Sequence, residues 1–297
     1  MIIDITVLGT SGSTPTKSRR MPGVAITYDG AVYLFDCGEG TQMQMIKYRI
    51  NASRLKGIFI THMHGDHIIG VVGLVRTLAL NNREAPLQIY VPKGYEEMMR
   101  KFITFDNISI YYKIEIIGVK SGVVYKDDKI TISAFRLNHA IPTFGYVFAE
   151  NERRRFIKEK CAALGIRGEM FGELQRKGSI IVNGKKVYLE SVTTAIPGKK
   201  IVYASDTRPS SSTVKAARNA DLLIHEATYS ETDSKKAIER KHSTAAEAAQ
   251  VAKMAAVKAL LLVHVSARYR RPNQLQKEAE AIFPNTKVAR DGAHIKL

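Results

Sequence analysis

The chain has 297 residues, of which 45% are hydrophobic and 25% are charged. These proportions are typical of a folded globular protein and exclude disorder or low complexity as the main description. Lysine and arginine total 45 against 28 acidic residues, and the resulting net charge of +17 predicts a surface that attracts polyanions. Nucleic acid is the leading partner class. Acidic membranes, acidic proteins and a merely well-solvated surface are the alternatives.

The predicted elements of the first half are mostly strands. They are expected at residues 2–8, 24–28, 31–35, 57–60, 87–91, 114–119, 130–137 and 146–148. Helices are expected at residues 42–48, 68–80 and 95–105. Asp29 and Gly30, between two apolar runs, predict a β-hairpin.

Residues 151–190 interrupt this pattern. The segment is polar, contains several glycines, and carries 10 Lys/Arg against 5 Asp/Glu. We expect an inserted basic arm within a single domain that spans residues 1–297. After the arm, strands are expected at 200–204, 222–225, 259–265, 287–289 and 294–297, and helices at 243–256 and 274–283. This alternation favours a layered α/β fold.

Two features bear on the compartment. Cys37 and Cys161 are too few for a disulfide framework and favour a reducing environment. The first ten residues lack the apolar core of a secretory signal, and residues 259–265 are far shorter than the ~20 residues of a membrane helix. We therefore expect a soluble, cytoplasmic protein without a membrane partner.

Three histidines and an aspartate lie in one heptapeptide, residues 61–67. In an extended segment residues two apart point to the same side, so His62 and His64 can converge on one ion. The glycine that follows lets the chain turn, so Asp66 and His67 can face a neighbouring ion. Imidazole and carboxylate ligands suit zinc and related transition metals.

Four ligands from one loop cannot fill two coordination spheres. His139, Asp206 and His264 each lie at or near the end of a predicted strand, where α/β proteins collect site residues. Taken alone, each could be an ordinary hydrogen-bonded polar residue. Their occurrence together with the heptapeptide predicts a metal centre.

The order of these residues resembles the metallo-β-lactamase superfamily, which implies a four-layer αββα sandwich with a metal site at one edge. Further motifs resemble its tRNase Z (RNase Z) family in the short form. They are residues 9–12, 36–42, 138–146, 205–207, 225–228, 242–244 and 264–269. The resemblance runs along nearly the whole chain.

The resemblance implies two zinc ions per chain, with Mn²⁺ as a substitute. It assigns seven ligands: His62, His64 and His139 to one ion, Asp66, His67 and His264 to the other, and Asp206 as the bridge. Zinc lowers the pKa of bound water toward ~7, so a nucleophile exists at neutral pH. Asp66 would orient that water and accept its proton. His242, held by Glu226, would protonate the leaving oxygen.

The implied reaction is cleavage of precursor tRNA after the discriminator nucleotide, which leaves a tRNA 3′-hydroxyl and a trailer 5′-phosphate. A homodimer is also implied, in which the arm of one subunit presents tRNA to the site of the other. The alternatives are another hydrolase of the superfamily, such as a small phosphodiesterase, and a basic RNA-binding module with structural metal. An open site argues against the last, because structural zinc is usually closed by four protein ligands.

The resemblance also suggests where tRNA is bound. Residues 15–20 resemble the P-x-K-x-R-N loop of the family, with Arg20 where that pattern has asparagine. The substrate-binding residues implied in all are Lys17, Arg19, Arg20, Ser266 and Arg268 in the body, and Arg153, Arg154, Arg155, Gly165, Gly168 and Gly172 in the arm. The glycines lie in a segment that resembles the family's Gly/Pro-rich tip but lacks its prolines. The alternative for the arm is a mobile charged loop.

Overall fold

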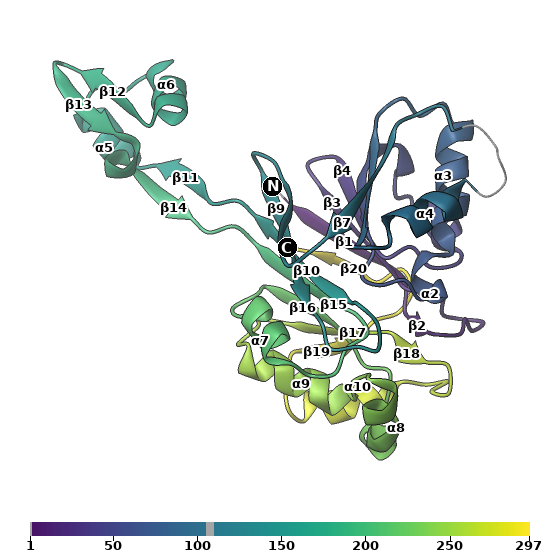
Figure 1. Ribbon diagram of the computed structural model, residues 1–297. Helices are drawn as coiled ribbons and strands as arrows, with labels where there is room; N and C mark the ends of the chain where they lie inside the picture. Colours follow the sequence, from purple (N-terminus) through teal and green to yellow (C-terminus); the bar gives the residue numbers. More distant parts are fainter. Residues whose placement is uncertain (1, 105–109) are drawn as a thin grey trace.

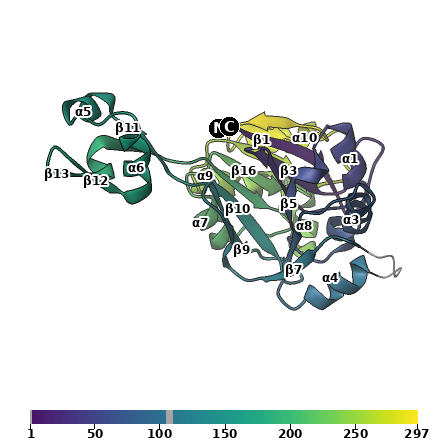
Figure 2. The same ribbon diagram turned by 90° about the horizontal axis from the view of Figure 1, so that it is seen from above.

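The computed structural model describes residues 2–104 and 110–297. Two seven-stranded sheets pack face to face, and helices cover the outer face of each (Figures 1 and 2). The predicted four-layer αββα sandwich is confirmed. Across the described residues, none of the helices combines the length and hydrophobicity of a membrane-spanning segment.

The first sheet is built mostly from the first 120 residues. Its strands in spatial order are β20 (His294–Lys296), β1 (Ile3–Gly9), β3 (Gly23–Tyr28), β4 (Ala31–Phe35), β5 (Leu55–Phe59), β6 (Leu87–Pro92) and β7 (Ile114–Val119). Helices α1 (Thr41–Lys47), α3 (Gly70–Leu80) and α4 (Glu96–Ile103) cover it. Asp29 and Gly30 have φ of 49° and 74°, as a two-residue hairpin turn requires, so the predicted hairpin is confirmed.

The second sheet contains the later strands. Their spatial order is β19 (Thr286–Val288), β17 (Leu260–Val263), β16 (Leu222–Glu226), β15 (Lys200–Ala204), β10 (Phe144–Glu150), β9 (Ile130–Arg136) and β8 (Gly122–Lys126). Helices α7 (Ser211–Ala217), α9 (Ala245–Met254) and α10 (Asn273–Glu280) cover it. Ala245, Ala248, Ala249 and Ala252 are fully buried, and their small side chains let α9 lie close to the sheet.

Aromatic rings fill the space between the sheets. Phe59 stacks on Phe35 and on Tyr90, with ring centroids 5.2 and 4.4 Å apart. From the opposite sheet, the Tyr146 hydroxyl donates to the Ile60 carbonyl at 2.7 Å. Each fully buried ring of this kind contributes about 1.5–3 kcal/mol to folding, so the two sheets are held together strongly beneath the site.

The topology brings one set of strand ends to a single edge. Strands β4, β5 and β6 are parallel, and so are β15, β16 and β17. Strand β9 runs in the same direction as β15, because each is antiparallel to β10. The predicted site residues lie at or after the carboxyl ends of β5, β9, β15, β16 and β17, so this topology gathers them.

Some element boundaries differ from the prediction. The helix expected at 68–80 is divided into α2 (Gly65–Ile68) and α3, and the strand expected at 259–265 ends at Val263, where His264 takes φ of 56°. Helix α9 starts at Ala245 because Thr244 caps it. Phe105, the expected end of a helix, lies outside the described residues. Strand β8, helix α7 and helix α8 (Ser234–Arg240) were not predicted.

The arm is a folded extension. Strands β11 (Arg153–Phe156) and β14 (Thr193–Ile196) form its stem, so the returning strand lies past residue 190. The outer part comprises α5 (Lys158–Ala163), α6 (Met170–Lys177), β12 (Ser179–Val182) and β13 (Lys185–Tyr188). Cys161, Ile166 and Leu174 belong to its own small core. In Figures 1 and 2 it projects well clear of the sandwich.

Candidate metal centre

The seven predicted ligands come together at the carboxyl edge of the two sheets. Their ligand atoms form two groups, each within 4.8 Å: His62, His64, His139 and Asp206 in one, and Asp66, His67 and His264 in the other. The first group joins the loop after β5 to the loops after β9 and β15. The second joins α2 to the end of β17.

Asp206 lies between the two groups. Its Oδ2 is 3.5 Å from His62 Nε2 and 3.8 Å from His139 Nε2. Its Oδ1 is 3.3 Å from His67 Nε2 and 3.2 Å from His264 Nε2. One carboxylate oxygen therefore faces each group, which is the arrangement needed to bridge two ions.

The ring nitrogens that face the centre fit a metal. The Nε2 atoms of His67, His139 and His264 are buried and have no hydrogen-bond partner. A buried polar atom without a partner costs free energy unless something else satisfies it. The donor set of imidazole nitrogen and carboxylate oxygen is the one that zinc prefers.

The opposite nitrogen of each of these rings is held in place. Such outer contacts orient metal-ligating histidines and fix their tautomer. The Nδ1 partners are Asp36 Oδ2 for His67 at 2.8 Å, the Lys241 carbonyl for His139 at 2.9 Å, and Thr228 Oγ1 for His264 at 2.9 Å.

Asp36 is a site residue to which the sequence interpretation gave no role. Its carboxylate accepts hydrogen bonds from Thr61 N at 2.8 Å, from Tyr203 Oη at 2.9 Å and from the His67 ring. It thus joins the end of β4 to the histidine loop and to the second sheet. Its φ of 56° lies in the left-handed region, which aspartate adopts more readily than most residues with a side chain. An acidic residue directly after the buried run 31–35 was the available signal.

Two glycines of the motifs are needed because neighbouring groups approach closely. A Cβ on Gly12 would lie 2.7 Å from the His264 ring, and one on Gly38 would lie 2.2 Å from the Asp66 carbonyl oxygen. Both separations are shorter than any ordinary contact. The glycines at residues 9–12 and 36–42 therefore allow the ligand loops to pack together.

His242 and Glu226 form a buried pair beside the centre. His242 Nδ1 lies 2.8 Å from Glu226 Oε1, and Thr207 N and Thr228 Oγ1 donate to the same carboxylate. Burial disfavours the charged forms of both side chains, but the attraction between the imidazolium and the carboxylate is larger than this cost. The pKa of His242 is raised to about 9 and that of Glu226 is lowered to about 2. The contact with Glu226 therefore favours the protonated form of the imidazole.

A cavity of about 610 Å³ opens onto the centre. Ser266 and Arg268 line it, as do His242 and two residues of α8 that the sequence did not suggest, Glu239 and Arg240. Arg268 Nη1 lies 3.4 Å from Asp233 Oδ1, and its guanidinium lies over the Tyr229 ring at 5.0 Å. The arginine is thus fixed at the cavity wall.

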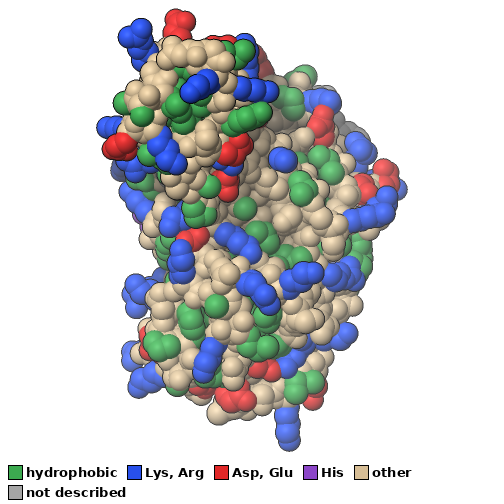
Figure 3. Space-filling model, turned by 90° about the vertical axis from the view of Figure 1, so that its left-hand side faces the viewer, with side chains coloured by type: hydrophobic (Ala, Val, Ile, Leu, Met, Phe, Trp, Pro, Cys, Tyr) green, Lys and Arg blue, Asp and Glu red, His purple; other side chains and the backbone are tan. Residues whose placement is uncertain are grey.

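The other predicted tRNA contacts lie outside this cavity. Lys17 and Arg20 are exposed, whereas Arg19 is only 7% exposed and presents little surface to a polyanion. In the arm, Arg153 pairs with Glu150 at 3.1 Å, and Arg155 is exposed. Figure 3 shows lysine and arginine side chains spread over the arm and the face beside it.

Gly165, Gly168 and Gly172 lie in the outer arm. Gly165 and Gly168 have φ of 76° and 55° in the connection between α5 and α6, where left-handed backbone favours glycine. Gly172 lies inside α6. Ile166, which lies between Gly165 and Gly168, is buried in the core of the arm. This segment is therefore packed and is not an open loop.

Comparison with known families agrees with this geometry. A family model described as anti-Pycsar protein Apyc1 matches residues 3–157, and one described as the beta-lactamase superfamily domain matches residues 186–265. Neither match includes the outer arm, residues 158–185.

Full-length relatives cover the arm as well. The chain is 42% identical over 296 residues to a ribonuclease Z of Archaeoglobus fulgidus, covering 98% of this chain and 96% of the relative. It is 39% identical over 292 residues to a ribonuclease Z of Methanothermobacter thermautotrophicus, covering 98% and 95%. The crystal structure of human tRNase Z, short form, superposes with a TM-score of 0.72 at 28% identity, covering 98% of both chains.

Proposed function

The chain belongs to the ribonuclease Z family, and from this membership we propose that it is a zinc-dependent endoribonuclease that removes the 3′ trailer of precursor tRNA. The cut would fall after the discriminator nucleotide and leave a tRNA 3′-hydroxyl and a trailer 5′-phosphate. The observation that carries the proposal is the pair of ligand groups that share Asp206, because a phosphodiester is hydrolysed well between two adjacent cations.

The two groups of ligand atoms support a site for two zinc ions, with Mn²⁺ as a substitute. His62, His64 and His139 would hold one ion, Asp66, His67 and His264 the other, and Asp206 both. Two such ions, when bound, supply a water that is activated at neutral pH and positive charge for the oxygens of the phosphate.

Two further side chains would move protons. Asp66 Oδ2 accepts a hydrogen bond from Ser13 N at 2.9 Å and lies 3.6 Å from both His67 Nε2 and His264 Nε2, so it can orient the attacking water and take its proton. His242 lines the cavity and is held by Glu226 through Nδ1, which leaves Nε2 to protonate the leaving 3′ oxygen. Ser266 and Arg268 would contact the phosphate.

The arm would bind the body of the tRNA. Residues 151–190 contain ten lysines and arginines and only five acidic residues. The arm can therefore contact phosphates without reading sequence. Arg153, Arg154 and Arg155 lie on the stem strand β11. An arm of this length favours a large, folded substrate over a small phosphodiester.

A homodimer would let the arm reach a site. Figure 1 shows the arm on the side of the sandwich away from α2, β2 (Ser11–Gly12) and β18 (Val265–Ser266), which adjoin the metal centre. The surface of α1 and α3 exposes large apolar side chains, namely Met43 at 65%, Ile46 at 64% and Leu80 at 82%. We propose that this face pairs two chains, so that each arm serves the other chain's site. A tRNA substrate and two buried free cysteines favour the cytoplasm.

The test is incubation of the metal-loaded protein with a precursor tRNA, followed by mapping of both product ends. We expect a 3′-hydroxyl on the discriminator nucleotide and about two zinc ions per chain by elemental analysis. Cleavage elsewhere, or none with zinc or manganese supplied, would contradict the proposal.

A shortened chain tests the arm separately. Replacing residues 158–185 by a short glycine-serine link should weaken precursor tRNA cleavage by about tenfold or more, because distal phosphate contacts are lost, while hydrolysis of bis(p-nitrophenyl) phosphate should persist. Equal loss of both activities would show that the arm supports the fold and does not bind tRNA.

A further inference from the structure

Arg208 contacts the backbone of the segment that carries His242. Its Nη1 donates to the His242 carbonyl and to Glu247 Oε2, both at 2.7 Å, and its Nη2 pairs with Glu247 Oε1. The Arg208 side chain is 20% exposed and Glu247 27%. Such a bidentate, largely buried ion pair is geometrically specific and restricts the guanidinium to one position.

Glu247 is itself fixed to a helix. Its Oε2 accepts from Thr244 N at 2.9 Å, and Thr244 Oγ1 accepts from Glu247 N at 3.1 Å, which together form the capping box at the start of α9. Arg208 is therefore anchored to the rigid end of a buried helix. Through the His242 carbonyl it links that helix end to a residue two positions before the N-cap Thr244.

The backbone around His242 is held on its other side by α8. His242 N donates to the Ala237 carbonyl at 2.8 Å. The preceding residue, Lys241, has φ of 55° and accepts the Nδ1 hydrogen bond of His139 through its carbonyl. A left-handed lysine is unfavourable by roughly 1–2 kcal/mol, so this turn depends on contacts from outside it.

The segment containing Arg208 also meets the other loops of the site. Arg208 N donates to the Asn138 carbonyl at 2.9 Å, next to the ligand His139. Thr207 N donates at 2.6 Å to Glu226, the carboxylate that holds the His242 ring. Residues 207–208 therefore contact both the backbone of His242 and Glu226, the carboxylate that holds the His242 ring.

We propose that Arg208 is a positioning residue for His242: its guanidinium holds the backbone from which the imidazole reaches the leaving oxygen. The inference rests on the proposed function in one respect, that His242 protonates the leaving group. Arg208 does not touch the cavity, so it acts on the chemical step and not on substrate binding.

The test compares two leaving groups with Arg208→Gln and Arg208→Lys. The 3′ oxygen of precursor tRNA needs a proton as it leaves, whereas p-nitrophenolate leaves bis(p-nitrophenyl) phosphate without one. For Arg208→Gln we expect kcat on precursor tRNA to fall about 10- to 100-fold at unchanged KM, since small misplacements of a catalytic group cost that much. Aryl ester hydrolysis and zinc content should stay near the wild-type values, and Arg208→Lys should recover part of the loss.

Arg218→Gln is the matched control. Arg208 and Arg218 both line a groove between α7 and α9. In the described ranges no hydrogen bond or ion pair joins the Arg218 guanidinium to the site. This variant should behave as wild type. Equal loss of both activities by Arg208→Gln, loss of zinc, or a change in KM alone would overturn the inference.

A wild-type protein that fails to cut precursor tRNA would contradict the proposed function by itself. A 3′,5′-linked dinucleotide then replaces tRNA in the comparison, because its 3′ oxygen also leaves as an alkoxide that needs a proton. The two failures are thereby distinguished.

Discussion

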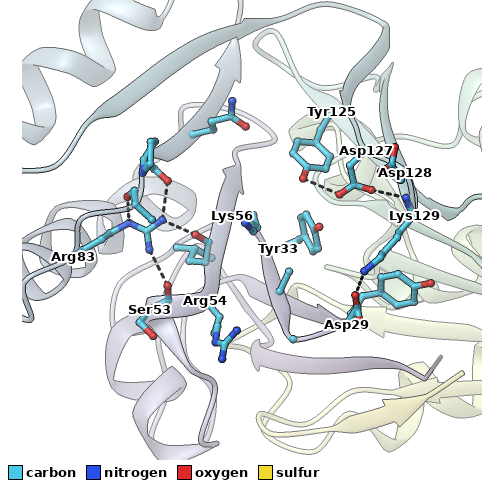
Figure 4. Close-up of a pocket in the computed structure, with 17 residues that line it drawn as sticks. Asp29, Tyr33, Ser53, Arg54, Lys56, Arg83, Tyr125, Asp127, Asp128 and Lys129 are labelled. Carbon is cyan, nitrogen blue, oxygen red and sulfur yellow. Dashed lines mark hydrogen bonds and ion pairs between the residues drawn. The ribbon is translucent and has the colours of Figure 1, made fainter.

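The two open edges of the sandwich carry cavities of similar size and opposite character. At the carboxyl edge the cavity of about 610 Å³ meets the metal centre, and at the opposite edge a cavity of about 720 Å³ opens beside the β3–β4 turn (Figure 4). Volume alone would favour the second as the site. The difference lies in whether the polar groups are already satisfied.

At the opposite edge four of the charged side chains labelled in Figure 4 have partners, namely Asp29, Arg83, Asp127 and Lys129. Arg83 donates to the carbonyls of Ser53, Leu55, Ala85 and Pro86 at 2.7–3.1 Å. The Tyr125 hydroxyl donates to Asp127, and Lys129 pairs with Asp29. At the metal edge the buried Nε2 atoms of His67, His139 and His264 make no hydrogen bond and face the Asp206 carboxylate at 3.2–3.8 Å. Polar atoms held in place but left unsatisfied distinguish a site built for a ligand from a surface hollow.

Removing Asp206, the proposed bridging carboxylate, should have the largest effect. Asp206→Ala leaves both ligand groups without their shared oxygens, so we expect zinc to fall below about one ion per chain and kcat to fall by at least ~10³-fold. Elemental analysis and single-turnover cleavage measure both. Asp127→Ala at the opposite edge is the control and should retain full metal content. Two bound ions in Asp206→Ala would refute the bridge.

Loss of His242, the proposed proton donor, should have the next largest effect. His242→Ala should lower kcat on precursor tRNA by about 10²–10⁴-fold, the usual contribution of general acid catalysis, with zinc content intact. Steady-state kinetics and metal analysis of the same preparation test this. Turnover at the wild-type rate would remove His242 from the mechanism.

Asp36 should show an intermediate effect. Asp36→Asn keeps a residue type that tolerates positive φ but weakens the acceptor that orients His67, so zinc affinity should fall about 10- to 100-fold, as for other outer contacts of metal ligands. Competition with a chelator measures the affinity. Unchanged affinity would show that Asp36 serves only to join the sheets.

Arg83 should show the smallest effect on activity. Arg83→Met removes the donors to four carbonyls, so we expect a loss of about 1–3 kcal/mol in the free energy of unfolding, with kcat and zinc content unchanged. Denaturant titration beside a kinetic assay checks both. A specific loss of precursor tRNA cleavage in this variant would mean that the larger cavity is functional after all.

Sequence patterns predicted most of the central strands because buried parallel strands appear as short apolar runs. They were less informative for α7 and α8, which are short and polar, and for β8, whose residues are half-buried or exposed. The arm was recognised by its composition, but its small core was not. Single buried residues such as Cys161, Ile166 and Leu174, far apart in a polar segment, show no periodicity.

The positive charge, the histidine motif and the likeness to a family of metal-dependent nucleases were all determined by the sequence, because residue type and spacing decide which ligands are available. Only the tertiary structure decided which atoms meet. Asp206 lies between the two histidine groups because β15 runs parallel to β16 and ends at that edge of the sheet. Asp36 and Arg208 gained their roles from contacts across 31 or more residues, over which local sequence carries no information.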